Sequence, residues 1–142
     1  MQITRGKLTL SLGLLVMAVM ACKMSATTAN ISSVKIGHDA EITKEDSNFE
    51  PEETIHVVAT ISNAPGKVKV RGRLVIVDVP GQKKGPVPGL EKTLDLPGST
   101  TASYTFTPPP SGWPAGSYEI EVIMMNEDGE QKDQKTVSFK VS

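Results

Sequence analysis

The sequence predicts an all-β protein in which one antiparallel β-sandwich of about seven strands occupies residues 31–142. The first observation is alternation, because short segments place apolar residues at every second position, as half-buried strands do. The second is turn chemistry, since Pro, Gly, Asn and Asp gather between these segments. The third is that no stretch beyond the N-terminal segment repeats apolar residues with a helical period over ten or more positions. At 142 residues, the chain fits one domain plus short extras.

The first three strands are separated by polar connections. Ser32–Gly37 and Thr54–Ser62 each alternate apolar residues, and a long acidic connection lies between them. Asn63-Ala-Pro-Gly66 then turns the chain into a third strand, Lys67–Val79. Gly72 within this strand predicts a bulge or the close approach of another chain segment.

The remaining strands are bounded by Pro and Gly. A loop over 80–89 precedes a short edge strand, Leu90–Leu96. Ala102–Thr107 ends at three prolines, and Tyr118–Met125 has the most regular alternation in the chain. An Asp-Gly turn leads to the last strand, Thr136–Val141.

The first 21 residues have the layout of an export signal, with basic residues before an apolar run of about 13 residues. That run is shorter than the roughly 20 residues that a helix needs to cross a bilayer. Val19-Met20-Ala21-Cys22 follows, and it resembles the bacterial lipobox. The resemblance implies a signal peptide over 1–21, a lipid on Cys22 and membrane attachment in the bacterial cell envelope, at the outer membrane or facing the periplasm. The alternative is an ordinary secretory signal with an incidental Cys.

Residues 22–30 are small and polar and predict a flexible tether. Cys22 is the only Cys of the chain, so an internal disulfide is excluded. Nine residues span at most about 30 Å when fully extended. The domain is therefore expected to sit close to its membrane.

Charge excludes one class of partner and identifies one candidate surface. The formal net charge is −1 and there is no dense basic run, which excludes nucleic acid as a partner. Lys67, Lys69, Arg71 and Arg73 alternate with other residues, so on a strand they would project from one face about 7 Å apart. Such a ladder is suited to anionic headgroups or an anionic glycan. The alternative is a sheet edge or solvent face that like charges keep soluble.

Trp113 is the second candidate for binding, and it is the only Trp. Gly112 and Pro114 flank it, just before the strand that begins near Tyr118. The favoured interpretation is a core residue, because the chain has few other large aromatic residues to fill its centre. The alternative is a stacking platform on a rigid loop, since loops of this kind carry function in sandwiches.

The sequence predicts no metal site and no cofactor. The final third resembles the periplasmic copper-carrier sandwiches, but Cys22 and Glu130 stand where those proteins have histidines. The acidic stretches lack the spacing of an EF-hand calcium loop. The other copper candidates come from distant strands, with Met124 pointing inward and Met125 outward, and they are His38, His56, Met124 and Met125.

The pattern as a whole resembles the immunoglobulin-like and fibronectin-III-like sandwich modules of bacterial envelope proteins. The residues that carry the resemblance are Phe49-x-Pro51, Gly112-Trp-Pro-x-Gly116-x-Tyr118 and Val137-x-Phe139-x-Val141. Tyr118 stands where such folds keep a tyrosine whose hydroxyl bonds a backbone group. Sandwiches of this kind host structural, binding and inhibitory roles alike. The leading expectation for this chain is a structural or interaction module that engages another envelope protein or a glycan.

The sequence favours a non-enzymatic protein, since it carries no Gly-x-Ser-x-Gly, no His-Glu-x-x-His and no phosphate-binding glycine loop. Two alternative functions remain open. One is inhibition of an extracytoplasmic protease through a protruding loop such as Pro80–Gly89 or Pro108–Trp113. The other is copper carriage in the cell envelope.

Overall fold

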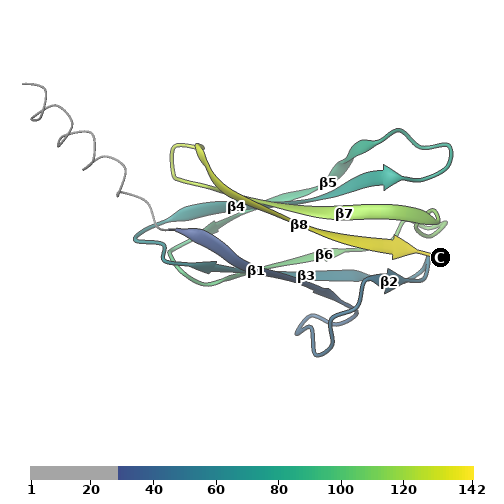
Figure 1. Cartoon of the computed structure of the whole chain (residues 1–142), viewed down its shortest axis with the longest axis horizontal. Coiled ribbons are helices and arrows are strands. Elements are labelled where there is room, and N and C mark those ends of the chain that lie inside the picture. The colour runs from purple at the N-terminus through teal and green to yellow at the C-terminus, as the bar shows by residue number, and fades with distance from the viewer. Residues whose placement is uncertain (1–28) are drawn as a thin grey trace, which may run out of the picture.

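A computed structural model describes residues 29–142 and shows two β-sheets packed face to face (Figure 1). The signal peptide, Cys22 and most of the tether fall within residues 1–28 and lie outside the described part of the chain. The all-β prediction is confirmed. The strands are β1 (Asn30–Gly37), β2 (Asn48–Phe49), β3 (Ile55–Ser62), β4 (Val68–Asp78), β5 (Gly85–Leu96), β6 (Thr101–Phe106), β7 (Gly116–Met125) and β8 (Gln131–Val141).

The smaller sheet has the strand order β1-β3-β6 and the larger has the order β2-β8-β7-β4-β5. Every pair is antiparallel except β2 with β8, which is parallel. The described residues therefore form eight strands where the sequence predicts about seven. The additional strand is β2, a pairing of only two residues in the long acidic connection that alternation over so short a length cannot reveal.

Several strand boundaries differ from the sequence prediction by one or two residues, and three differences change the description of the fold. β1 begins at Asn30, the last residue assigned to the tether. β8 begins five residues earlier than expected, at Gln131. β5 begins at Gly85, inside the predicted loop, and its pairing with β4 is interrupted between Arg73 and Val75 of β4. Pro and Gly in the first half of β5 are tolerated because this strand is at the edge of its sheet.

Alternation places the core between the sheets. β3 buries every second residue from Ile55 to Ile61, and β6 buries Ala102, Tyr104 and Phe106. The predicted close approach at Gly72 is confirmed, because a Cβ added there would lie 2.9 Å from the ring of Tyr104.

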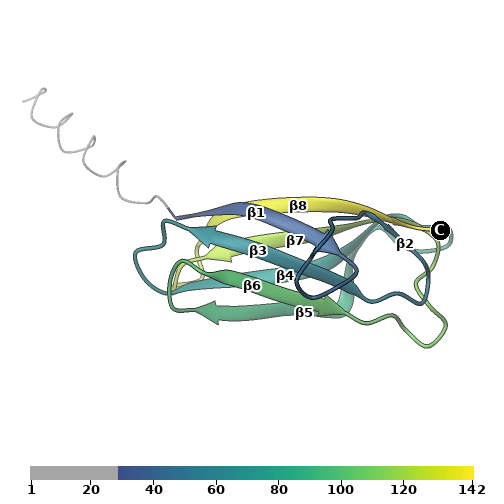
Figure 2. The same ribbon diagram turned by 90° about the horizontal axis from the view of Figure 1, so that it is seen from below.

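The sheets are stacked with an offset (Figure 2). At one side β1 lies against β8, where the Ile31 N–H donates to Asp133 Oδ2 at 2.8 Å. Further across, the Tyr104 hydroxyl of β6 donates to the Val70 carbonyl of β4 at 2.6 Å. At the other side β5 extends past β6. Residues of these two edge strands line a surface recess. No helix among residues 29–142 is long and apolar enough to cross a membrane.

Candidate binding site between the two sheets

The basic residues identified from the sequence lie on the outer face of the larger sheet. Lys69, Arg71 and Arg73 alternate along β4 with buried residues, and Lys67 is exposed just before the strand. β4 lies between β5 and β7, so the idea that these charges protect a sheet edge is wrong.

Carboxylates on the neighbouring strands interrupt the basic ladder. Arg73 pairs across the sheet with Glu91 of β5 and Glu121 of β7, and Lys69 pairs with Asp95. The Arg73 guanidinium bonds Glu121 Oε1 through Nη2 at 2.5 Å and Nε at 3.0 Å. The ladder is therefore part of a mixed-charge face, and its role in anion binding stays a prediction.

Lys67 and Lys69 border a surface recess of about 510 Å³ that also has carboxylates in its wall, from Asp95 and Glu127. Arg71 has a buried Nε without a hydrogen-bond partner among the described residues.

Trp113 is buried, with 5% of its surface exposed, as the core interpretation predicts. Gly112 precedes it with φ of 81°, and a Cβ at that position would lie 2.9 Å from the Pro51 side chain. The Trp113 backbone N–H donates to the Pro51 carbonyl at 2.8 Å. The indole Nε1 donates to the Glu53 carbonyl, also at 2.8 Å. The turn at residues 50–53 thus fixes the position of the indole.

Tyr118 confirms the predicted hydrogen bond at the end of the sandwich. Its hydroxyl donates to the Pro114 carbonyl at 2.5 Å. Its ring stacks on Phe139, with centroids 5.2 Å apart and planes 9° apart. Burial raises the pKa of Tyr118, so the hydroxyl is a neutral donor at physiological pH.

Trp113 and Tyr118 line a cavity of about 350 Å³ beside β5, and Thr107 borders it just past the end of β6. The volume falls at the lower end of the roughly 300–1,000 Å³ typical of ligand pockets. Gln82 and Thr107 supply polar groups. The other lining residues are apolar, and they are Leu74, Ile76, Val87, Pro88, Leu90, Pro109 and Pro114.

A second recess of about 280 Å³ adjoins this cavity. It shares Leu90 and Thr107 with the cavity and is also bordered by Lys92, Tyr104 and Phe106. The two spaces together form a groove between β5 and β6, which we call the β5/β6 groove. Its cavity part is mostly apolar, as in a typical binding pocket, and its second recess adds the polar side chains of Glu91, Lys92 and Thr105.

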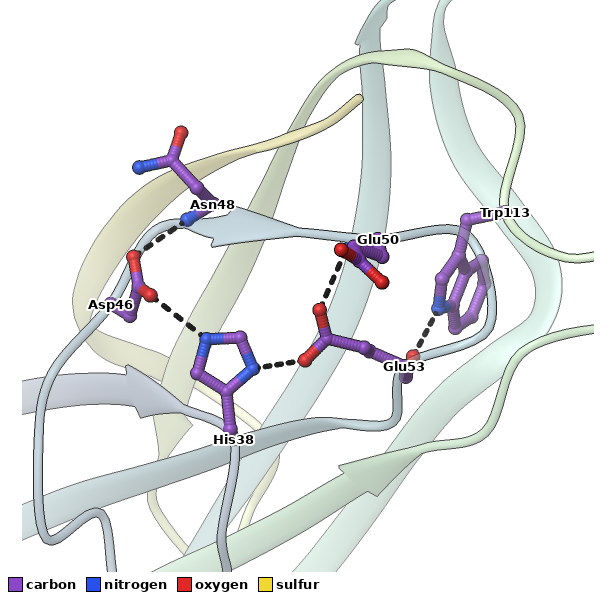
Figure 3. Close-up of polar contacts among 6 residues, drawn as sticks. All are labelled: His38, Asp46, Asn48, Glu50, Glu53 and Trp113. Atoms are coloured by element: carbon purple, nitrogen blue, oxygen red, sulfur yellow. Dashed lines mark hydrogen bonds and ion pairs between the residues drawn. The ribbon is translucent and has the colours of Figure 1, made fainter.

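A histidine cluster lies beside Trp113 (Figure 3). His38 Nε2 is 2.9 Å from Asp46 Oδ2, and His38 Nδ1 contacts Glu53 Oε2. The ring also packs on Phe49 at a centroid distance of 4.5 Å. Since both ring nitrogens face carboxylates, the doubly protonated imidazolium is the form that donates to both.

These contacts shift two pKa values. The hydrogen bond to Asp46 is the largest cause of the raised pKa of His38, and burial opposes it. The same bond lowers the pKa of the Asp46 carboxyl. Glu53 Oε1 also accepts the Glu50 N–H at 2.9 Å, so the cluster braces the turn that holds Trp113.

Sequence reasoning identified Trp113 but missed the rest of the groove. The apolar residues of β5 were divided between a predicted loop and a short edge strand. His38, Asp46 and Glu53 lie in or beside an irregular connection, where no periodic pattern indicates that they meet. The available signal was the continuous apolar run Leu74-Val-Ile-Val77, which suggests a strand with partly covered residues on both faces.

The residues considered for copper lie in two separate places, because His56 pairs with Gly37 beside His38, whereas Met124 and Met125 are the last residues of β7. Met124 is buried near the end of β7 and pairs with Asp133, which bonds Ile31 at the start of β1. His38 follows the far end of β1, and strand length separates it from that region by roughly 20 Å. Residues 29–142 contain no group of three His, Cys, Asp or Glu side chains placed to hold a metal ion.

No protein-family model and no curated protein matches the sequence. Among solved structures, the fold is similar to a Niemann-Pick type C2 protein from Japanese carpenter ant, with a TM-score of 0.51, 20% identity, and coverage of 82% of this chain and 94% of that one. The soluble domain of PmoD from a Methylocystis species gives a TM-score of 0.44 at 16% identity, over 77% of this chain and 89% of that one.

A β-glucosidase from Listeria innocua gives a TM-score of 0.48 at 15% identity, over 82% of this chain but only 16% of the enzyme. At these identities the likeness concerns the fold alone. The chain is an immunoglobulin-like β-sandwich, as the sequence predicts.

Proposed function

We propose that this chain is a non-enzymatic interaction module, anchored in the bacterial cell envelope through a lipid on Cys22, that binds an apolar group of another envelope component in the β5/β6 groove. The carrying observation is the cavity of about 350 Å³ lined by Trp113, Tyr118 and aliphatic side chains. An apolar group that fills it would remove these side chains from water at about 25 cal/mol per Å².

The position of the groove supports this function. Asn30 pairs with Ser62 at one end of the sandwich, where the tether joins the domain. The loops that carry Gln82 and Trp113 are at the other end (Figure 1). The ten residues of β7 cover about 34 Å between these ends. A lipid on Cys22 would therefore direct the cavity away from the membrane.

The test uses the full chain in phospholipid vesicles with anilinonaphthalene sulfonate as an apolar probe. Trp113 is the only Trp, so energy transfer from its indole reports probe bound in the cavity. We expect saturable transfer above a vesicle-only blank. Leu90→Gln should weaken it several-fold, because Leu90 lines the cavity. Val34→Gln is the matched control, since Val34 is also half-buried against the core but lies on β1, outside both recesses of the groove.

Equal transfer in both variants would contradict a site in the groove. The anchor is tested separately by fractionation. Cys22→Ala should move the protein from the membrane pellet to the soluble fraction, and retention in the pellet would show that a lipid on Cys22 is not what holds it.

A further inference from the structure

The smaller sheet has room for one more strand beside β6. β1 packs against β8. β6 packs on β4, where the Tyr104 hydroxyl donates to the Val70 carbonyl and the Tyr104 ring lies next to Gly72. No strand within residues 29–142 lies beyond β6 to cover the inner face of β5 (Figure 2). Leu90 and Leu94 point to this uncovered region and remain half-buried.

The edge of β6 is ready to pair with another strand. The Ile61 N–H donates to the Thr100 carbonyl at 2.8 Å, which makes residues 61 and 100 a hydrogen-bonded pair. In an antiparallel ladder, hydrogen-bonded and non-hydrogen-bonded residue pairs alternate. Counting from residue 100, the β6 residues that are hydrogen-bonded to β3 are therefore Ala102, Tyr104 and Phe106. The remaining residues of β6 therefore direct their backbone N–H and C=O groups away from β3, and they are Thr101, Ser103 and Thr105.

The two edge strands of the groove differ in their protection. β6 contains no Pro, no bulge and no charged residue. β5 carries Pro86, Pro88 and an interrupted register, together with charged side chains. Proteins use such features to prevent strand pairing at exposed edges. Pairing is therefore prevented at β5 and permitted at β6.

The groove also indicates the chemistry of the incoming strand. The inward side chains of the incoming strand would lie over Leu94, Lys92 and Leu90, which occupy every second position on the inner face of β5. Lys92 pairs across the sheet with Gly72, beneath the Tyr104 ring, and makes no ion pair with any residue from 29 onward. Two apolar side chains with an acidic one between them would complement this row.

We propose that the partner of the β5/β6 groove is an extended protein segment that pairs with Thr101, Ser103 and Thr105 of β6 and faces β5 with an apolar–acidic–apolar alternation. This inference rests on the proposed function and specifies its partner. Main-chain hydrogen bonds supply affinity in this mode, and pockets for alternate side chains supply specificity.

The experiment presents a displayed library of nine-residue peptides, with Thr at outward positions and random inward positions, to the full chain in vesicles. We expect selected peptides to carry an acidic residue between two apolar ones. Peptides selected with the Lys92→Glu variant should carry Lys or Arg in place of that acidic residue. Ser103→Pro should weaken binding roughly tenfold, because it removes one outward N–H without breaking the bonds to β3.

Ser103→Ala is the matched control and should bind as the wild type does, since it keeps the N–H. If Ser103→Pro does not fold, strand addition is tested instead by amide hydrogen exchange of the wild type with and without bound peptide. Bound peptide should protect the Thr101, Ser103 and Thr105 amides, and unchanged exchange there would overturn strand addition.

Two further results would also overturn it: peptides bound equally by Ser103→Pro and Ser103→Ala, or no peptide binding while the apolar probe still receives energy from Trp113. In the latter case the proposed function stands with a partner that is not a strand. Loss of both peptide and probe binding would remove the proposed function as well.

Discussion

The two sides of the sandwich differ in how they are closed. On the β1 side, the smaller sheet packs directly on β8, and the Ile31 N–H reaches across to Asp133. Ile31 is fully buried there. On the β5 side, the smaller sheet ends one strand short, and Leu90 and Leu94 remain half-buried. The first side completes the core, whereas the second leaves apolar surface and unpaired backbone groups accessible.

This difference means that the closed side contributes mainly to the stability of the fold and the open side mainly to binding. Apolar area that is already removed from water stabilises the fold, and apolar area that remains exposed is available to a partner. Substitutions on the closed side should therefore lower the free energy of unfolding. Substitutions on the open side should act mainly on binding.

The largest expected effect is on the closed side. Ile31→Ala should lower the free energy of unfolding by about 2–5 kcal/mol, because it removes a fully buried side chain and leaves a cavity. Leu90→Ala, on the open side, should cost less than about 1.5 kcal/mol. Urea denaturation of both variants measures the difference. Similar losses would show that the two sides are equally important for stability.

A smaller effect is expected where the covered region ends. Gly72→Ala should cost about 1–3 kcal/mol, because the new Cβ would press against the Tyr104 ring, which is buried and hydrogen-bonded to Val70. Gly66→Ala is the control, since a Cβ added there would meet no other group within 4 Å. It should change stability by no more than about 0.5 kcal/mol. Thermal melts of the two variants would contradict the packing argument if they coincided.

The smallest effect is expected at the His38 cluster. The raised pKa of His38 means that its contribution is complete below the ordinary value of 6.5 and is lost as pH rises through the pKa of the folded state. The lowered pKa of Asp46 means that its contribution is present above 3.8 and is lost as pH falls through the pKa of the folded state. The stability difference between wild type and His38→Gln should therefore be largest between these two ordinary values.

Chemical denaturation between pH 3 and 9 measures this difference. Because the cluster is largely exposed, added salt should reduce it. A difference that is constant over the whole pH range would show that the ion pairs with Asp46 and Glu53 do not stabilise the fold.

Much of the fold could be predicted from alternation and turn residues. The strand from Tyr118 to Met125, the close approach at Gly72 and the burial of Trp113 all follow from local patterns. The extent of β5 could not be predicted in this way, because Pro and Gly normally end a strand and are tolerated here only at a sheet edge. β2 was missed because two residues are too few to show a period.

The candidate site was less predictable than the fold. Trp113 was identifiable as the single large aromatic residue before a strong strand. Its partners in the cavity come from β4, β5 and two loops, and no local pattern connects them. The basic ladder was correctly placed on one face, but the carboxylates that interrupt it belong to neighbouring strands and depend on register.

The sequence by itself determined the all-β class and the inward and outward faces of most strands, because these properties follow from the alternation of residues along one chain segment. The expectation of an anchored N-terminus follows from the resemblance of residues 19–22 to the lipobox. Only the tertiary structure decided which strand would lack a partner across the sandwich, and hence where the groove opens. That outcome depends on the offset between the two sheets, which is set by pairing between residues far apart in the chain.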